Sequence, residues 1–469
     1  MTGTTLAMPR VATWLAGGAF AGAFLTALSF ITPVAPLMIV AAAAIAIGLV
    51  AAIDHPEVGL VLAVGAATLD QVGRLAEFGP FKLTFYQALV AYIGLILVLR
   101  LVKGRSRFPA TPIDLPVALF LGLVAASLFV ARDIGVGMVG AVSLASSAFL
   151  AYAVVTLGDT PRRLSVIVLG TLAVGGVIGV LGMIERAEIF AIVGYLPIWG
   201  EGVRAKVTFA DPNIMGSFQL AAAALAFPLV LIARDWRLKV AGLLVIFATV
   251  AGLLSTGSRG ATVGFAIALL VVLAFSRIRF SAKVAVLLAV VLLGGAWFAF
   301  IADPVWLENR VLNVAEDGSM LARVYMGASA MEIAADNPRG VGIGNYPVYY
   351  PFYRDASVRF NLIESHTAYL TILVETGLLG LLAFLGVLGT SFVATARAAW
   401  RSADPTIHAL AVGAMAASIG LAAQAFTYSL ENSKFWWLII GIGLATWAIV
   451  RETETGHPVL TEKDGAIEK

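Results

Sequence analysis

The stretch that decides the fold is VAPLMIVAAAAIAIGLVAAI, residues 34–53, which contains no charged residue. A helix needs about 20 such residues to cross the roughly 30 Å hydrocarbon core of a bilayer. The rest of the chain has the same character: 60% of its 469 residues are hydrophobic, 13% are charged, and the mean hydropathy is +0.95. This composition excludes a globular cytosolic enzyme, because it leaves no polar face for water.

Apolar runs of similar length follow one another along the chain. Each is expected to be a helix, because lipid offers no partner to exposed backbone polar groups. The first run is interpreted as an uncleaved membrane anchor, since a second span follows almost at once. The expected fold is all-α, a polytopic integral membrane helix bundle of about 12–14 transmembrane helices with one long extracytoplasmic loop. The predicted spans are 11–31, 33–53, 57–73, 83–101, 113–131, 134–157, 163–184, 213–233, 237–254, 260–276, 283–301, 377–396, 406–428 and 435–450.

These runs divide the chain into four predicted parts. Residues 1–301 form an N-terminal transmembrane bundle of about 11 spans, and residues 302–366 form the extracytoplasmic loop. Residues 367–452 contain three further spans. Residues 453–469 are a cytoplasmic tail that is predicted to be disordered, because it is polar and lacks apolar periodicity.

The basic residues predict the orientation. Lys and Arg concentrate in alternate connections, such as 100–107, 234–239 and 277–283, which the positive-inside rule assigns to the cytoplasm. Both termini are therefore predicted to be cytoplasmic. Of the four histidines, this topology places His366 alone on the outer side, where the long loop meets the next span.

Charge and cysteine content exclude further classes of function. The net charge of +3 is scattered along the chain without a basic helix or strip, so no nucleic-acid partner is expected. The chain has no cysteine, which excludes a disulfide, a thiolate nucleophile and a Cys-ligated metal.

The first unusual outward segment is EGVRAKVTFADPNIMGSF, residues 201–218. Asp211 at a helix N-cap, followed by Pro212 at the first helical position, is favourable capping chemistry. Arg204 precedes this helix start and either binds an anion or reaches lipid headgroups as an interfacial anchor. The residues alone leave both interpretations open.

The second segment is LLSTGSRGATVGF, residues 253–265, a tight turn whose single charge is Arg259. A guanidinium beside backbone amides at a helix start can bind an anion, because Arg offers a bidentate fork and the helix N-terminus adds partial positive charge. An ionisable residue so close to apolar spans is costly to insert, which favours a functional role for Arg259 over an interfacial anchor.

The third segment is the long loop with Arg323, followed by NPRGVGIGNYPVYYPFY, residues 337–353. Its aromatic residues either form an interfacial belt or stack on sugar rings. The glycines in this segment resemble a dinucleotide-binding fingerprint only superficially, because no strand precedes them and no acidic residue follows at the required distance. The candidate glycan-binding residues are Tyr346, Tyr349, Tyr350 and Tyr353.

His366 is the candidate general base. An imidazole with an ordinary pKa near 6.5 can take a proton from a hydroxyl near neutral pH. Arginines on the same face should lower the pKa of His366 and keep the ring neutral, the form that a base requires. The competing interpretation is a satisfied structural histidine.

Together, these residues resemble the O-antigen ligase and O-antigen polymerase superfamily, over about residues 200 to 430. The family's motif is His, then Asn, Ser or Gln, nine residues, and Gly-x-x-Gly. Here it reads His366, Thr367, nine residues and GLLG from Gly377 to Gly380, so Thr367 departs from the pattern but keeps a hydroxyl. The TFADPN segment, the STGSRG turn and the three spans after the long loop also look like the family arrangement.

The resemblance implies a glycosyltransferase of the bacterial inner membrane that acts on its periplasmic face. The donor would be an undecaprenyl-diphosphate-linked glycan, with its diphosphate bound by Arg204, Arg259 and Arg323. His366 would activate an acceptor sugar hydroxyl for inverting attack on the anomeric carbon. The outward segments contain no Asp-x-Asp metal clamp, so chemistry without a metal is expected, and no cofactor is expected. The resemblance implies that the acceptor is lipid A core or a growing glycan, and that membrane lipids surround the protein.

Several alternatives remain open from the sequence. Within the family, the same residues serve an O-antigen ligase, a repeat-unit polymerase or a transferase to protein, and ligase is slightly favoured. From another class, a polytopic transporter or lipid flippase fits the number of spans. A transporter usually shows an internal repeat and ionisable residues near the midplane, and the sequence shows neither a repeat nor more than one acidic candidate within a span.

Overall fold

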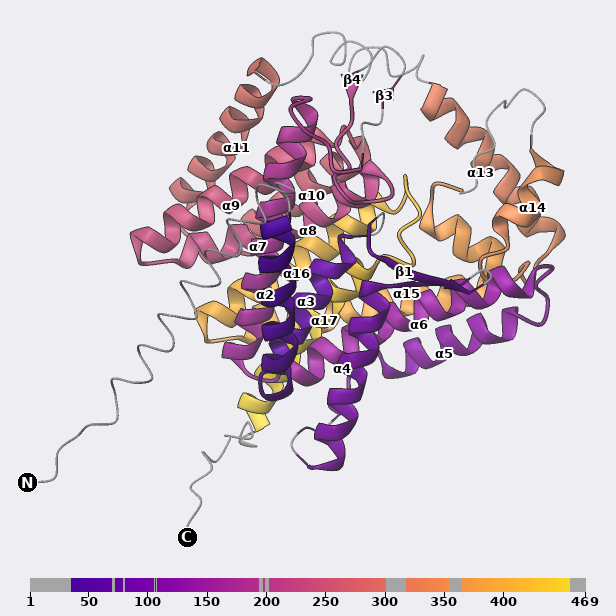
Figure 1. Cartoon of the computed structure of the whole chain (residues 1–469), viewed down its shortest axis with the longest axis horizontal. Coiled ribbons are helices and arrows are strands. Elements are labelled where there is room, and N and C mark those ends of the chain that lie inside the picture. Colours follow the sequence, from indigo (N-terminus) through magenta and orange to yellow (C-terminus); the bar gives the residue numbers. More distant parts are fainter. Residues whose placement is uncertain are drawn as a thin grey trace, which may run out of the picture.

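A computed structural model describes residues 35–69, 72–78, 81–104, 106, 108–193, 197–198, 202–300, 318–354 and 365–455. The part that it describes is a polytopic all-α membrane protein with little sheet (Figure 1). Within these residues, eight helices are long and apolar enough to cross a membrane, and four shorter apolar helices accompany them. The fold class predicted from composition is confirmed; the predicted anchor at 11–31 and the tail at 453–469 fall wholly or mostly outside the described residues.

The helices coincide closely with the predicted spans. Before the long loop they are α2 (Ala35–Asp54), α3 (Pro56–Ala67), α4 (Phe85–Val102), α5 (Asp114–Ser127), α6 (Ile134–Leu157), α7 (Pro161–Arg186), α8 (Pro212–Ile232), α9 (Trp236–Ser255), α10 (Arg259–Phe275) and α11 (Phe280–Phe300). After the loop they are α15 (Ala368–Arg401), α16 (Pro405–Gln424) and α17 (Lys434–Thr455). Two short hairpins, β1 (Arg74–Phe78) with β2 (Phe81–Thr84) and β3 (Pro197–Ile198) with β4 (Gly202–Val203), lie in the connections.

The centre of the bundle is formed by α8, α16 and α17, whose apolar windows are each more than 70% buried. Small residues let neighbouring helices approach closely. A Cβ atom added to Gly264 of α10 would collide with the backbone of Gly420 of α16, and one added to Gly252 of α9 with the backbone of Gly179 of α7. Such small-residue contacts are typical of helix packing in membranes, where backbones can approach without side chains between them.

The long segment between α11 and α15 contains two helices, α13 (Gly318–Asp336) and α14 (Tyr346–Tyr353), which lie beside the start of α15 (Figure 1). They enclose a second, separate hydrophobic cluster that includes Met326, Ile333 and Tyr350. Where the structure describes this segment, the predicted loop therefore has a core of its own.

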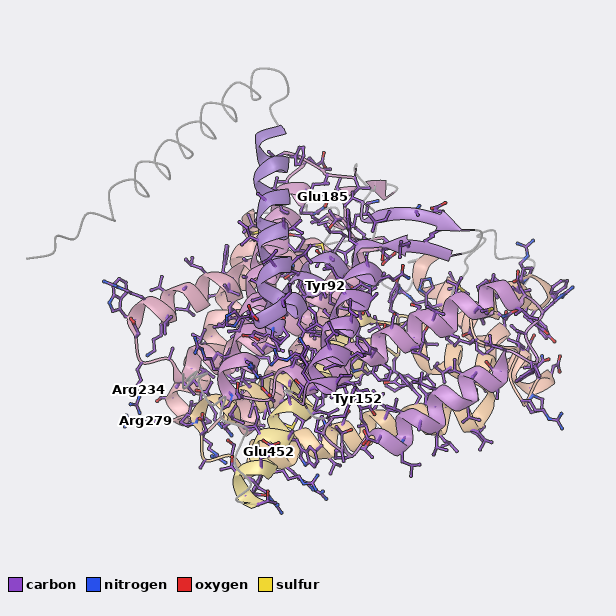
Figure 2. All side chains as sticks on the ribbon, turned by 60° about the horizontal axis from the view of Figure 1, so that its bottom comes forward. Tyr92, Tyr152, Glu185, Arg234, Arg279 and Glu452 are labelled. Carbon is purple, nitrogen blue, oxygen red and sulfur yellow. The ribbon has the colours of Figure 1, made fainter. Side chains whose placement is uncertain are left out.

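The connections gather at two ends of the bundle, in agreement with the predicted alternation. At one end, Thr208 Oγ1 donates to the Thr68 carbonyl at 2.6 Å, and the backbone N–H of Asp133 donates to Asn345 Oδ1 at 2.8 Å. At the other end, Arg277 donates to the Ser402 carbonyl at 2.9 Å. Figure 2 shows Glu185, of the first end, far from Arg234, Arg279 and Glu452. We call the first the His366 end and the second the opposite end.

α15 is bent within its first third. Gly377 has φ 71° and ψ −177°, so the helix is interrupted there and resumes towards Arg401. The predicted span began at residue 377, and the kink explains this boundary: residues 368–376 form a short helical piece that lies before the long apolar one.

Candidate functional site

His366 lies in the turn that leads into α15. Its backbone has φ 54°, and its neighbours Ser365 and Thr367 are joined by a hydrogen bond from Ser365 Oγ to the Thr367 carbonyl at 2.9 Å. The hydroxyls of Ser365 and Thr371 are 2.6 Å apart, which fastens the turn to the first helical piece. The ring of His366 packs against Tyr428, with 5.7 Å between the ring centres. The imidazole is therefore held by the structure around it, in a conformation that is uncommon for a residue other than glycine.

The environment of His366 favours the neutral ring. Burial lowers its pKa, the positive charge of Arg323 lowers it further, and the carboxylate of Asp211 acts in the opposite direction. Nδ1 is buried and has no hydrogen-bond partner among the described residues. A neutral imidazole near pH 7 can accept a proton from a hydroxyl.

Arg204 and Arg259 are brought together by a hydrogen-bond network at the start of α8 and α10. Arg204 donates from Nε to the Thr256 carbonyl at 2.7 Å and from Nη2 to Asn213 Oδ1 at 3.4 Å. Ser258 Oγ donates to the same Asn213 oxygen at 2.7 Å, and Arg259 is the first residue of α10. The Arg204 guanidinium and the backbone of Arg259 therefore lie at adjoining helix N-termini, an arrangement that suits a diphosphate.

The arginine network is tied to the His366 turn through the end of α16. Gln424 Nε2 donates to the Asn213 carbonyl at 3.1 Å, and the N–H of Ala368 donates to the Ala425 carbonyl at 2.9 Å. The structure thus gathers three of the predicted residues, Arg204, Arg259 and His366, at one end of the bundle. Arg323, on α13, is close enough to His366 to act on its pKa.

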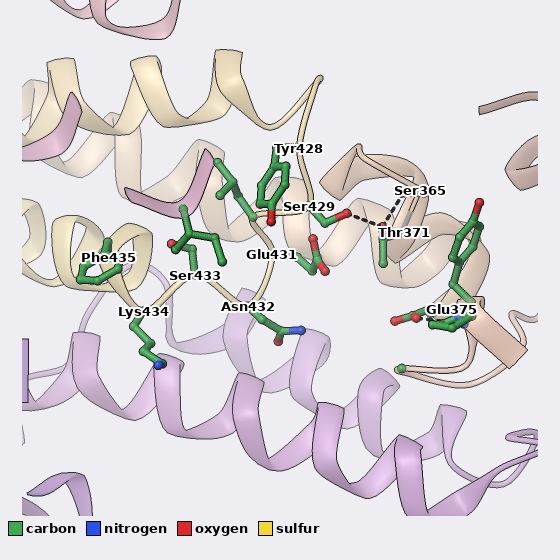
Figure 3. Close-up of a pocket in the computed structure, with 15 residues that line it drawn as sticks. Ser365, Thr371, Glu375, Tyr428, Ser429, Glu431, Asn432, Ser433, Lys434 and Phe435 are labelled. Carbon is green, nitrogen blue, oxygen red and sulfur yellow. Dashed lines mark hydrogen bonds between the residues drawn. The ribbon is translucent and has the colours of Figure 1, made fainter. Parts of the chain in front are cut away.

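A cavity of about 380 Å³ lies beside the His366 turn (Figure 3). One wall is the connection between α16 and α17, from Tyr428 to Phe435, and the opposite wall is formed by Gly344, Tyr346, Pro347 and Glu375. Ser365 and Thr371 close the end that is nearest His366. In Figure 3 the side chains of Glu431 and Glu375 point into this space from opposite walls.

The glycine-rich segment of the long loop is a docking segment for α15. The N–H groups of Val341 and Gly342 donate to the carbonyls of Val374 and Glu375, each at 2.9 Å. The Glu375 carboxylate accepts the N–H of Tyr346 at 3.1 Å. Gly340, with φ 87°, passes so close to the Glu375 carbonyl that a Cβ atom would lie 2.5 Å from it. The glycines of this segment therefore allow its backbone to pack closely against the backbone of α15.

The four tyrosines have unequal surroundings. Tyr350 is 3% exposed inside the cluster of α13 and α14, where Tyr349 and Tyr353 pack at its edge. Tyr353 donates its hydroxyl to Asp336 at 3.0 Å. Only Tyr346 lines the cavity among the four, and it is 1% exposed. Packing thus accounts for much of this aromatic density. Contact with a glycan stays a prediction, and Tyr346 is the tyrosine of the four whose position beside the cavity fits it.

Sequence reasoning missed the residues of the cavity wall. Glu431 and Asn432 stand in a short connector, SLENSK, that looked like an ordinary turn between spans. Glu375 stands in the apolar stretch LTILVETGLLG, where a lone acidic residue is a signal that deserved to be followed. Tyr428 falls at the end of the predicted span 406–428.

Comparison with known proteins adds an independent observation. Residues 243–385 match the family model described as O-antigen ligase. This region includes Arg259, Arg323, His366 and the kink of α15, whereas Arg204 and the connection from Tyr428 to Phe435 lie outside it. No curated protein matches the chain. The match over residues 243–385 supports the resemblance of this part of the chain to the O-antigen ligase and polymerase superfamily.

Proposed function

We propose that the protein transfers a glycan from undecaprenyl diphosphate to a sugar hydroxyl at the periplasmic face of the bacterial inner membrane. The acceptor we favour is lipid A core, which makes the protein an O-antigen ligase. The observation that carries this proposal is the placement of a half-buried imidazole, whose pKa is lowered by burial and by Arg323, beside a cavity and at the same end of the bundle as Arg204 and Arg259. The family match supports the reaction class.

The arginine site suits the donor. Arg204 and Arg259 stand where two helix N-termini meet, and both the guanidinium charges and the helix dipoles favour a diphosphate. Charge on the diphosphate grows as its bond to the sugar breaks, so these groups bind the transition state more strongly than the ground state.

The proposed step balances without a metal or a cofactor. The acceptor oxygen attacks the anomeric carbon of the donor, a new C–O bond forms, and the bond from that carbon to the diphosphate oxygen breaks. The lipid diphosphate leaves with the bonding electrons, and the hydroxyl proton passes to the His366 imidazole and then to water. Attack from the face opposite the leaving group inverts the anomeric centre.

The first test is transfer by the purified full chain in detergent. Undecaprenyl-diphosphate glycan is incubated with lipid A core in one arm and alone in the other. We expect transfer to lipid A core, and a loss of about 10²- to 10⁴-fold in His366→Ala, because general-base help contributes about that factor. His55→Ala, which removes an exposed histidine from the opposite end, should keep wild-type activity.

The incubations with and without lipid A core distinguish a ligase from the alternative functions. Chain extension with donor alone would make the protein a repeat-unit polymerase with the same site. Full activity of a normally folded His366→Ala protein would overturn the role of His366. Absence of transfer in both arms, with intact donor, would favour a protein acceptor or the transporter alternative.

A further inference from the structure

The size of the cavity beside His366 and the side chains that line it indicate which class of ligand it can bind. Its volume of about 380 Å³ falls within the range of about 300–1,000 Å³ that is usual for small-molecule sites. The lining combines apolar and aromatic surface with a group of hydroxyl, carboxylate and amide side chains. The polar side chains are Ser365, Thr371, Glu375, Ser429, Glu431, Asn432 and Ser433.

This lining does not suit a lipid chain. A polyprenyl or acyl chain in the cavity would remove these polar groups from water without offering them hydrogen bonds, which is unfavourable for each group. A ligand rich in hydroxyl groups can instead donate to the carboxylates and the amide oxygen and accept from the serines.

The charges in the cavity separate it from the arginine site. Glu375 and Glu431 are 3% and 6% exposed, and both carboxylates face the cavity (Figure 3). Lys434 also lines it, but its Nζ lies over the ring of Tyr86, 4.6 Å from the ring centre. The Glu431 carboxylate would repel a diphosphate at short range, so the donor's leaving group fits the arginines and a neutral sugar fits the cavity.

Two lining side chains present buried polar atoms. Asn432 Oδ1 and Ser433 Oγ are buried and have no hydrogen-bond partner among the residues that the structure describes. A buried acceptor without a partner is unfavourable, so a ligand hydroxyl that donates to Asn432 gains more than it would on an exposed surface.

The cavity is adjacent to the proposed base. Ser365, which lines it, precedes His366 in the chain, and Tyr428, which also lines it, packs on the His366 ring at 5.7 Å between ring centres. A sugar bound in the cavity therefore has its nearest hydroxyl groups beside the imidazole.

We infer that this cavity binds the terminal sugar of the acceptor glycan through its hydroxyl groups, and that Glu431 and Asn432 determine acceptor specificity. The inference rests on the proposed function, because it assigns the second substrate of that reaction. Donor and acceptor then occupy separate parts of the His366 end, one cationic and one lined by carboxylates.

Binding to the full chain in detergent tests the inference without turnover. The probes are two lipid-free oligosaccharides, the lipid A core oligosaccharide and the glycan repeat unit, and inorganic diphosphate, each followed by isothermal titration. We expect one oligosaccharide to bind about ten- to a hundredfold more weakly to Glu431→Gln and to Asn432→Ala, since a hydrogen bond to a charged or buried group contributes about that factor. Diphosphate binding should be unchanged in both variants and weakened in Arg259→Ala.

Glu454→Gln is the matched control, because Glu454 is an exposed carboxylate at the opposite end, 3.3 Å from Arg401. It should bind all three probes as the wild type does. Glu431→Asp, which keeps the carboxylate, should recover part of the lost affinity.

Wild-type affinity for both oligosaccharides in Glu431→Gln and Asn432→Ala would overturn the inference, as would absence of binding to the unaltered protein. Weakened diphosphate binding in Glu431→Gln would also overturn it, because the cavity would then serve the donor. The proposed function is judged separately by glycan transfer in the unaltered protein, so its failure can be told apart from failure of this inference.

Discussion

At the scale of single residues, the protonation of His366 is the property that the structure constrains most directly. Burial and Arg323 both lower its pKa, so the neutral base persists below the ordinary value near 6.5. We expect kcat/KM to be flat around neutral pH and to fall only as the pH drops through this lowered pKa.

Arg323→Ala should shift the pH at which kcat/KM falls on the acidic side of the profile, which we call the acidic limb. Removing the positive charge makes the imidazolium less unfavourable, so the pKa of His366 rises and activity begins to fall at a higher pH than in the wild type. The measurement is the pH profile of kcat/KM. Arg354→Ala, which removes a cation from the same segment that is not among the charges acting on His366, should leave the limb in place; an unmoved limb in Arg323→Ala would contradict the assignment.

The residues differ in how far the sequence could reveal them. Arg204, Arg259 and His366 stand out because charges and a histidine are rare beside apolar spans, and the structure places them at one end. Glu431 and Asn432 could not be assigned, because their importance depends on the walls opposite them. Those walls come from the long loop and α15, which are distant in the sequence or separated by a helix.

At the scale of elements, Gly377 is the position where the backbone demands glycine. Its φ of 71° and ψ of −177° lie in a region that only glycine occupies readily, and a Cβ atom would lie 2.8 Å from the Pro338 carbonyl oxygen. Gly377→Ala should therefore destabilise the protein by about 1–3 kcal/mol.

Thermal unfolding in detergent measures this effect, and Gly389→Ala is the control on the same helix. An added Cβ at Gly389 meets no atom within 4 Å, so alanine there should be neutral or stabilising by up to about 1 kcal/mol. Equal stability of the two variants would show that the kink does not require glycine.

Hydropathy predicted the helices well and their interruptions poorly. Lipid forces an apolar run of sufficient length to be helical, so the ends of α6 coincide with the predicted span and those of α8 and α17 lie one to five residues from theirs. The kink at Gly377 and the helices α13 and α14 depend on packing between the long loop and α15. The mean hydropathy of a local stretch of sequence contains no information about such contacts.

At the scale of the whole molecule, the predicted orientation can be read by chemical labelling, because the chain has no cysteine of its own. Ala210 is exposed at the His366 end and Ala403 at the opposite end. We expect a membrane-impermeant maleimide to label Ala210→Cys in spheroplasts, and Ala403→Cys only after the membrane is opened. The reverse pattern would place the site in the cytoplasm and exclude a periplasmic transferase.

The glycine crossings bear on how heat acts on the protein. Gly264 and Gly420 join α10, which begins with Arg259, to α16, which ends near Tyr428, and neither glycine has a rotamer to restrict. Ordering an arginine side chain, in contrast, costs up to about 2 kcal/mol of conformational entropy. The contact between α10 and α16 therefore has little side-chain disorder to gain on warming, whereas the side chain of Arg259, at the start of α10, has more.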